Sequence, residues 1–358
     1  MSLNTKEVYL DNSATTPVLP DIADRIRSVM VDEFGNPSSS HSKGVLAESL
    51  ITEARKNISQ ALEVKNKEIF FTSGGTESNN WALVSAALSR RRRGDHIICS
   101  SIEHPSVLEV VKYLGQNGFK VDYCPVNRWG IIEPDVLADL VNPGTVLVSI
   151  MLVNNEIGSV QPIKDLVKVC KNKNPNIIFH SDCVQAVGKV QVYPRQMGVD
   201  LISMSAHKIH GPKGAGALFV KEGTNLRSII YGGGQELGFR SGTENVPGIV
   251  GFGMALKRAI GEQNEISAQA APHIINLSFA GVRGEVLARV LEADQIYVST
   301  GSACTSRKTK TSHVLKAIGL SDQEAAGSIR ISLSGLNTRE DMEHLAEALK
   351  HALEQLVH

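Results

Sequence analysis

Two short apolar runs, each ending in a chemically capable side chain, decide the fold. The first is Ile177-Ile178-Phe179-His180-Ser181-Asp182, and the second is Leu201-Ile202-Ser203-Met204-Ser205-Ala206-His207-Lys208. Apolar runs of about four to eight residues between polar stretches are typical of buried strands. Asp182 and Lys208 would then lie at the carboxyl ends of two strands, which is the edge where open α/β sheets bind their ligands.

The same alternation extends from these runs toward the N-terminus. The expected strands are Glu68–Phe71, His96–Ser100, Lys120–Tyr123 and Thr145–Met151, and the expected helices are Thr76–Arg91, Pro105–Gln116 and Ile163–Asn172. Strands that alternate with amphipathic helices predict a largely parallel sheet with helices on both faces, which is an α/β fold.

The pattern changes after about residue 255. A helix at Val246–Glu262 leads to expected strands at Ile274–Phe279, Ile296–Ser299 and Ser328–Ser332, and a last helix is expected at Arg339–Val357. A chain of 358 residues is long for one domain. We therefore expect a large domain at residues 15–255 and a smaller α+β domain made of residues 1–14 and 256–358.

The composition limits the possible partners and compartments. The chain has 37 Lys and Arg residues and 37 Asp and Glu residues, so a general attraction to nucleic acid is not indicated. No apolar run reaches the length of about 18 residues that a membrane span needs, and Met1–Tyr9 does not resemble a secretory signal. We expect a cytoplasmic protein that binds neither nucleic acid nor membranes.

The five cysteines include no pair with the spacing of a zinc site, and they suggest reduced thiols. Four of them, Cys99, Cys124, Cys170 and Cys183, lie in or beside apolar runs and are expected in the core. Cys304 differs, because small polar residues surround it in a stretch before an expected helix at Ser312–Ile318. Such a loop could present a reactive thiol, although an ordinary loop cysteine remains the alternative.

Three features near the strand ends suit an aldehyde cofactor that carries a phosphate. Gly74-Gly75-Thr76 follows a strand and opens a helix, so it could hold a phosphate at the helix N-terminus or simply form a turn capped by Thr76. Asp182 could keep a pyridinium nitrogen protonated, or it could bind a metal or cap a helix. Lys208 could form a Schiff base with an aldehyde, whereas a lysine in isolation would be an ordinary surface residue.

Other polar residues near the same edge are candidates for substrate contacts. His104 could stack on a flat cofactor or move a proton, or it could cap a helix. Arg330 could bind a substrate carboxylate, or it could form an ion pair with an acid of the protein itself. Asn155 and Gln185 are further candidates.

Together these motifs resemble the cysteine desulfurase family, within the class V, fold-type I enzymes that use pyridoxal 5'-phosphate (PLP). The resemblance covers nearly the whole chain. The matching stretches are Tyr9–Thr16, Gly35–Ser38 with His41, Phe71–Ser78, Glu103-His104, Val153–Gly158, His180–Gln185, Ser205–Gly216, Gly232–Asn245, Gly301–Ser306 and Ile329–Ser332. The resemblance implies a fold-type I transferase, in which a mostly parallel sheet of the seven-stranded type lies between helices.

The resemblance also implies how the cofactor is held. Lys208 would bind PLP covalently, Asp182 would contact the pyridine nitrogen, and Gln185 would lie near the ring hydroxyl. The implied phosphate ligands are Gly75, Thr76, Ser205 and His207, with Thr243 reaching the phosphate of a neighbouring subunit in a homodimer.

The implied reaction removes sulfur from L-cysteine. His104 would stack on the ring and assist proton transfer, and the residues that orient the substrate would be Asn155, Arg330 and Asn12. Cys304 would attack the substrate sulfur, which leaves a persulfide on Cys304 and releases L-alanine. The loop around Cys304 is similar to the subgroup that passes sulfur to iron–sulfur scaffolds or to enzymes that thiolate transfer RNA or cofactors.

Two alternatives use the same framework. Another class V enzyme, such as an aminotransferase or a selenocysteine lyase, would share Lys208 and Asp182 but would not need Cys304. A protein that keeps the fold without catalysis is the second, although intact Lys208, Asp182, His104 and Cys304 argue against it.

One segment departs from the family pattern. The family usually has a longer helix, a turn and a strand where this chain has only Gln263–Ala271. Either the segment is truly deleted, or the sequence joins the two ends of a longer stretch. We favour the second explanation, because loss of that helix and strand would expose the core of the small domain.

Overall fold

The computed structural model describes residues 7–261, 270–300 and 311–356, and its centre is a seven-stranded sheet in the order β2-β8-β7-β6-β5-β3-β4. The strands are β2 Ile69–Thr72, β3 His96–Ser100, β4 Lys120–Cys124, β5 Thr145–Ser149, β6 Ile178–Asp182, β7 Leu201–Ser205 and β8 Gly216–Val220. Only β8 pairs antiparallel with its neighbours, β2 and β7. The predicted α/β fold with a mostly parallel sheet is therefore confirmed.

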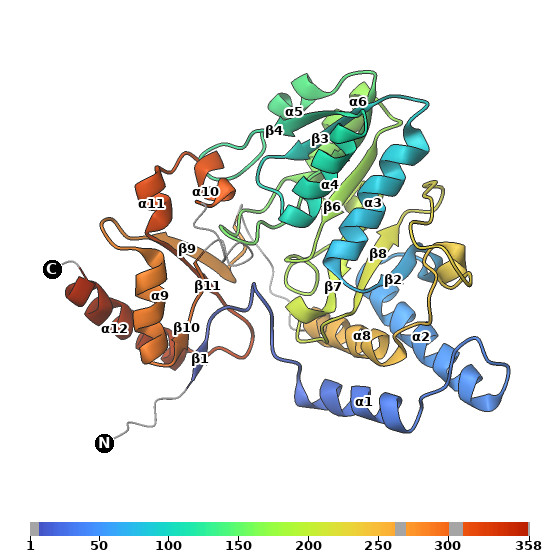
Figure 1. Ribbon diagram of the computed structural model, residues 1–358, viewed down its shortest axis with the longest axis horizontal. Helices are drawn as coiled ribbons and strands as arrows, with labels where there is room; N and C mark the ends of the chain where they lie inside the picture. Colours follow the sequence, from blue (N-terminus) through green and yellow to red (C-terminus); the bar gives the residue numbers. More distant parts are fainter. Residues whose placement is uncertain (1–6, 262–269, 301–310, 357–358) are drawn as a thin grey trace.

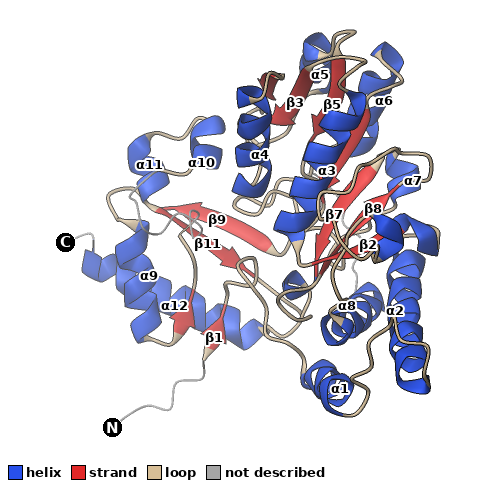
Figure 2. Ribbon diagram, turned by 45° about the vertical axis from the view of Figure 1, so that its right-hand side comes forward, coloured by secondary structure: helices blue, strands red, loops and turns tan. Residues whose placement is uncertain are grey.

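Helices cover both faces of this sheet (Figure 2). They are α1 Pro20–Val31, α2 Ser42–Ala61, α3 Gly75–Arg90, α4 Pro105–Gln116, α5 Pro134–Leu140, α6 Ile163–Lys173, α7 Pro194–Met197 and α8 Val246–Gly261, with short 3₁₀ helices at Asn66–Glu68, Ala206–Lys208 and Glu236–Gly238. Apolar side chains of α3 and α4, such as Trp81 and Val111, pack on one face. Those of α1, α2, α5, α6 and α8 pack on the other.

Strand β8 is an element that the sequence analysis missed. Its five residues are all buried, and Gly211, Pro212 and Gly214 precede it in the sequence. Only the short 3₁₀ helix at Ala206–Lys208 lies between β7 and β8, so the chain turns back and the two strands pair antiparallel. Helices α1 and α2 were likewise not predicted.

The remaining elements form a second, smaller group at the left of Figure 1. It contains β1 Val8–Tyr9 paired with β10 Ile296–Tyr297, β9 Ile274–Ser278 paired with β11 Ser328–Ser332, and the helices α9 Gly284–Ala293, α10 His313–Ala317, α11 Asp322–Ala326 and α12 Arg339–Leu356. Leu10, Leu287, Ile329 and Leu345 belong to an apolar core of its own. This separate core supports the division into two domains, whose boundaries remain a prediction.

One face of β9 is exposed next to the short connection at residues 262–269, which lies outside the described part of the chain. Ile275 and Leu277 are 40% and 37% exposed. Exposed apolar residues at alternate positions of a strand are what the loss of a covering element would leave. Within the described ranges, no helix combines the length and apolar character needed to cross a membrane.

Candidate active site

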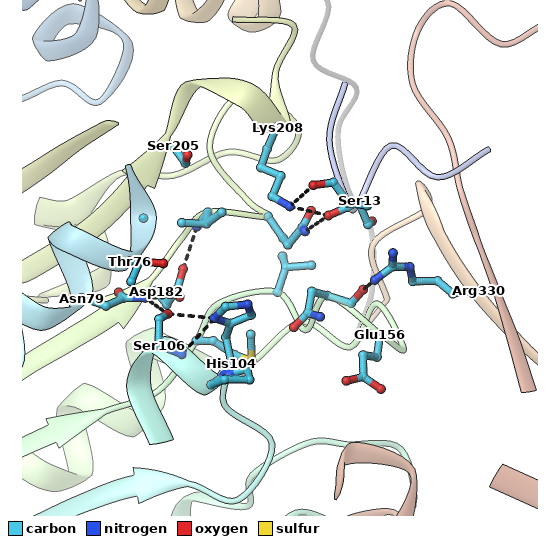
Figure 3. Close-up of a pocket in the computed structure, with 18 of the residues that line it drawn as sticks. Ser13, Thr76, Asn79, His104, Ser106, Glu156, Asp182, Ser205, Lys208 and Arg330 are labelled. Carbon is cyan, nitrogen blue, oxygen red and sulfur yellow. Dashed lines mark hydrogen bonds between the residues drawn. The ribbon is translucent and has the colours of Figure 1, made fainter. Parts of the chain in front are cut away.

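A cavity of about 520 Å³ lies at the carboxyl ends of the parallel strands, and the smaller group of elements closes one side of it. Its wall is made of Ser13, Ala14, Gly75, Thr76, Asn79, His104, Pro105, Ser106, Met151, Val153, Asn155, Glu156, Asp182, Val184, Gln185, Ser205, His207, Lys208, Thr311, Ser312, His313 and Arg330. In Figure 3, Lys208 and Ser13 lie at the top, Thr76, Asn79 and Asp182 at the left, and Arg330 and Glu156 at the right.

The structure brings most of the predicted site residues together in this wall. These are Gly75, Thr76, His104, Asn155, Asp182, Gln185, Ser205, His207, Lys208 and Arg330. Asn12 and Thr243 do not line the cavity of the single chain. Cys304 lies outside the described residues.

The stretch that was predicted to hold a phosphate is tightly constrained. Gly74 has φ +150°, and α3 begins at Gly75. A side chain at Gly75 would begin 2.7 Å from the Cγ2 atom of Val184, so any larger residue would force Val184 to shift. Thr76, Ser205 and His207 add polar groups beside the helix N-terminus. A free helix N-terminus with such neighbours suits a phosphate.

Asp182 is buried at the end of β6, with 5% of its surface exposed. Its Oδ2 atom accepts a hydrogen bond from Asn79 Nδ2 at 2.7 Å, and Oδ1 accepts one from the Val184 N–H at 2.9 Å. Among the described residues there is no group of three or more His, Cys, Asp or Glu side chains that could hold a metal ion. Both carboxylate oxygens of Asp182 thus have a hydrogen-bond donor, and the residue also lines the cavity.

A chain of hydrogen bonds joins Asp182 to His104. Asn79 Nδ2 also donates to Ser106 Oγ at 2.8 Å, and Ser106 Oγ lies 2.8 Å from His104 Nδ1. The Ser106 N–H donates to the same Nδ1 atom at 3.1 Å, so this nitrogen is an acceptor and the neutral ring carries its proton on Nε2. Burial lowers the pKa of His104, although the charge of Asp182 opposes this effect. His104 thus caps α4, which was one of the alternatives for this residue, and it also lines the cavity.

Lys208 lies across the cavity from Asp182 in Figure 3. Its Nζ atom donates to the backbone carbonyls of Ser13 at 2.5 Å and Ala14 at 2.7 Å. Gln185 Nε2 donates to the Ser13 carbonyl at 2.9 Å, and Gln185 Oε1 accepts a hydrogen bond from Lys189 Nζ at 3.1 Å. Burial lowers the pKa of Lys189 to about 7, and the charge of Lys208 adds to this effect. The turn that follows β1 thus contacts both Lys208 and Gln185 through its backbone carbonyls.

Arg330 reaches the cavity from β11, and its side chain is 3% exposed. Its Nη2 atom forms an ion pair with Asp11 Oδ1 at 2.6 Å, and Nη1 donates to the Asn155 carbonyl at 2.9 Å. Its Nε atom is buried and has no hydrogen-bond partner among the described residues. The alternative reading, an ion pair with the protein's own acid, is therefore present in the structure, and Arg330 lines the cavity as well.

Asn12 has a different environment from the one expected of a substrate ligand. Its side chain is 1% exposed and donates to the Ser332 carbonyl at 2.9 Å. This bond joins the turn after β1 to β11, so Asn12 links these two segments and does not line the cavity.

The sequence analysis missed several residues of the wall. Asn79 lies one turn into α3, Glu156 directly follows Asn155, and Ser312 and His313 begin α10. The only signal in the sequence was the polar stretch Asn154-Asn155-Glu156 after an expected strand.

The four cysteines that were expected in the core are buried, and each is 0% exposed. They are Cys99, Cys124, Cys170 and Cys183. Burial raises the pKa of Cys124 and of Cys170 to about 12, and it raises the pKa of the other two thiols as well. None of the four lines the cavity.

Comparison with protein families matches the chain to Aminotransferase class-V over residues 8–270 and 259–345. Cysteine desulfurase IscS of Clostridium botulinum is 41% identical over 379 positions, which cover 98% of this chain and 95% of the relative. Cysteine desulfurase IscS of Methanosarcina thermophila is 40% identical and covers 99% of this chain. The family match is split into its two parts near the short connection at residues 263–271.

Solved structures agree with these relatives. A NifS-like protein superposes with a TM-score of 0.90 at 38% identity over 98% of this chain and 100% of the other. A structure titled SspA in complex with cysteine gives a TM-score of 0.83 at 35% identity over 92% of this chain and 99% of the other. The chain belongs to the class V aminotransferase family of PLP-dependent enzymes and, within it, to the cysteine desulfurases.

Proposed function

We propose that the protein removes sulfur from L-cysteine with PLP as cofactor and releases L-alanine. The observation that supports this most directly is the arrangement of Lys208, Asp182 and Arg330 around one cavity of about 520 Å³. These residues offer an amine for an aldehyde, a carboxylate for a ring nitrogen and a guanidinium for a carboxylate.

The residues present fit PLP at each of its polar groups. Bound PLP supplies an electron sink for the charge that develops when the substrate loses its α-proton. Lys208 would hold the aldehyde carbon, Asp182 the ring nitrogen and Gln185 the ring hydroxyl. The phosphate would lie at the N-terminus of α3 with Gly75, Thr76, Ser205 and His207, and Thr243 of a second subunit would complete this site in a homodimer.

Three further residues of the wall, Arg330, Asn155 and His104, would orient the substrate or assist proton transfer. Arg330 and Asn155 lie together at one end of the cavity, where Arg330 would bind the carboxylate of L-cysteine. The relative whose structure is titled SspA in complex with cysteine supports this choice of substrate. The His104 ring is neutral and carries its proton on Nε2, so this atom would assist proton transfer as a hydrogen-bond donor, and Lys208 would accept the α-proton.

Cys304 would receive the sulfur. Its thiolate would attack Sγ of the substrate, so that an S–S bond forms as the Cβ–Sγ bond breaks, and a proton at Cβ completes alanine. The products are a Cys304 persulfide and L-alanine, and no external oxidant or reductant is needed. An iron–sulfur scaffold or an enzyme that thiolates transfer RNA or a cofactor would then accept the sulfur. Five cysteines without a CxxC pair support a reducing compartment such as the cytoplasm.

The test is to incubate the purified holoenzyme briefly with L-cysteine, map the mass of Cys304 and assay alanine. We expect one added sulfur on Cys304 and released alanine, and we expect Cys304→Ala to abolish both. Alanine release that survives this substitution would refute the role of Cys304 and would favour another class V activity. A holoenzyme that yields neither persulfide nor alanine would refute desulfuration altogether.

A further inference from the structure

Glu156 is a buried carboxylate in the cavity wall that the proposed reaction does not use. Its side chain is largely enclosed, and its Oε2 atom accepts a hydrogen bond from Ser312 Oγ at 2.5 Å. Ser312 is buried as well, and its hydroxyl oxygen accepts from the Leu315 N–H at 3.2 Å as the N-cap of α10. A carboxylate therefore fixes the residue at which α10 begins.

Ser312 also marks one end of the chain segment that contains Cys304. The other end is Ser299, whose backbone pairs with Arg330, with the Arg330 N–H donating to the Ser299 carbonyl at 2.6 Å and the Ser299 N–H donating in return at 3.1 Å. Both ends are thus attached to residues that line the cavity, Arg330 at one end and Glu156 at the other. Figure 3 shows Glu156 and Arg330 on the same side of it.

Glu156 is itself held firmly by three different parts of the chain. Its backbone N–H donates to Asn154 Oδ1 at 2.8 Å, and its carbonyl accepts from Asn276 Nδ2 of β9 at 3.2 Å. Burial raises the pKa of its carboxyl to about 7, against the effects of the Ser312 hydrogen bond and the charge of Arg330. Burial of a carboxylate is unfavourable unless hydrogen bonds or charges compensate for the loss of water. The hydrogen bond from Ser312 provides such compensation, so the two residues depend on each other.

We propose that Glu156 is a positioning residue for sulfur transfer, because it holds Ser312, and with it one end of the segment that contains Cys304, against the substrate cavity. The inference rests on the proposed function. Ser312 lies eight positions after Cys304, a reach of at most about 29 Å for an extended chain. The effective concentration of a tethered group depends on where its tether is fixed. Release of Ser312 would therefore lower the effective concentration of the Cys304 thiol at the substrate.

The test separates chemistry that needs Cys304 from chemistry that does not. Alanine release from L-cysteine needs the thiol, whereas exchange of the α-proton of L-alanine with deuterated water needs Lys208 and the cofactor but not Cys304. We would measure both in the holoenzyme for Glu156→Ala, Glu156→Gln, Ser312→Ala and the double variant Glu156→Ala/Ser312→Ala. The matched control is Ser321→Ala, which removes the N-cap serine of α11, another five-residue helix, away from the cavity.

We expect Glu156→Ala and Ser312→Ala each to lower kcat for alanine release about 10- to 100-fold, the range that a small misplacement of a reacting group produces. Exchange of the α-proton should stay near the wild-type rate. The double variant should lose no more activity than the less active of the two single variants, because both substitutions break the same contact. Glu156→Gln should retain most of kcat, since its amide oxygen can accept from Ser312, and Ser321→Ala should behave as wild type.

Several outcomes would overturn the inference. Losses that multiply in the double variant would show that the two residues act separately. Equal losses of proton exchange would indicate damage to the cofactor site, and a Glu156→Gln variant as poor as Glu156→Ala would show that the ionised carboxylate matters instead of the contact. If Glu156→Ala does not fold, Ser312→Ala alone must still separate the two activities. Wild-type protein that exchanges the proton but releases no alanine would instead contradict the proposed function, and the inference with it.

Discussion

Glu103, the residue before His104, allows a sharp test of the electrostatics below the cavity. It is 0% exposed, its Oε1 atom accepts from the Met151 N–H at 2.7 Å, and Oε2 has no hydrogen-bond partner among the described residues. Burial raises the pKa of this carboxyl well above its ordinary value of 4.5, and the charge of Asp182 adds to the effect. We therefore expect Glu103 to stay protonated in the folded protein at pH values where the unfolded chain ionises it.

The sign of the pH dependence follows from this difference. Above the ordinary pKa the folded state holds a proton that the unfolded state has released, so the free energy of unfolding falls as the pH rises. One such group contributes a slope of about 1.4 kcal/mol per pH unit. Between about pH 5 and about pH 6 the wild type should therefore lose about 1.4 kcal/mol relative to Glu103→Gln, which cannot ionise there.

Urea denaturation of the two holoenzymes across this pH range is the assay, with Glu347→Gln on the exposed side of α12 as the control for loss of one carboxyl group. Alanine release by Glu103→Gln should change little near neutral pH, because both side chains are uncharged. If the free energies of unfolding of wild type and Glu103→Gln change equally with pH, Glu103 is ionised in the folded protein and the reasoning is wrong.

Three further substitutions test the cavity. Lys208→Ala should lower alanine release more than about 100-fold and remove the visible absorbance of covalently held cofactor; retention of both would contradict its role. Asn79→Ala removes a hydrogen bond to the buried Asp182, worth about 1.5–3 kcal/mol, so we expect weaker retention of PLP on dialysis, and unchanged retention would count against the bridge. The wild type should gain thermal stability as the pH rises from about 7 to about 9, because Lys189 binds a proton in the unfolded chain that it has lost in the folded protein. Lys189→Met should abolish this gain, which melting curves at both pH values measure. An unchanged gain in the variant would show that Lys189 is not its source.

The sheet and the position of the cavity could be predicted because buried strands leave a clear pattern. Runs such as Thr145–Ser149 are short and largely apolar, and parallel strands place their carboxyl ends at one edge. Strand β8 escaped prediction because glycine and proline precede it, and these residues first suggest a turn. Its antiparallel direction depends on its pairing with β7 and β2, which no local pattern encodes.

The cavity was predictable only where a residue follows a strand directly. Glu156 and Ser312 meet across 156 residues of sequence, and Asn79 and Asp182 across 103. Such contacts arise from the packing of two domains and of a helix on a sheet, so spacing along the chain gives no sign of them. The expected role of Thr243 needs a second subunit, and a single chain cannot bring it to the cavity.

The burial of four cysteines has a practical consequence for a protein that handles reactive sulfur. A persulfide passes its outer sulfur to any accessible thiolate, and a thiol that is both enclosed and hard to ionise is a poor recipient. Cys99, Cys124, Cys170 and Cys183 meet both conditions, so stray transfer within the chain is disfavoured. The same property makes alkylation of the native protein selective: rapid labelling by a thiol reagent would report on Cys304, and its stoichiometry would count the sulfur acceptor sites available per chain.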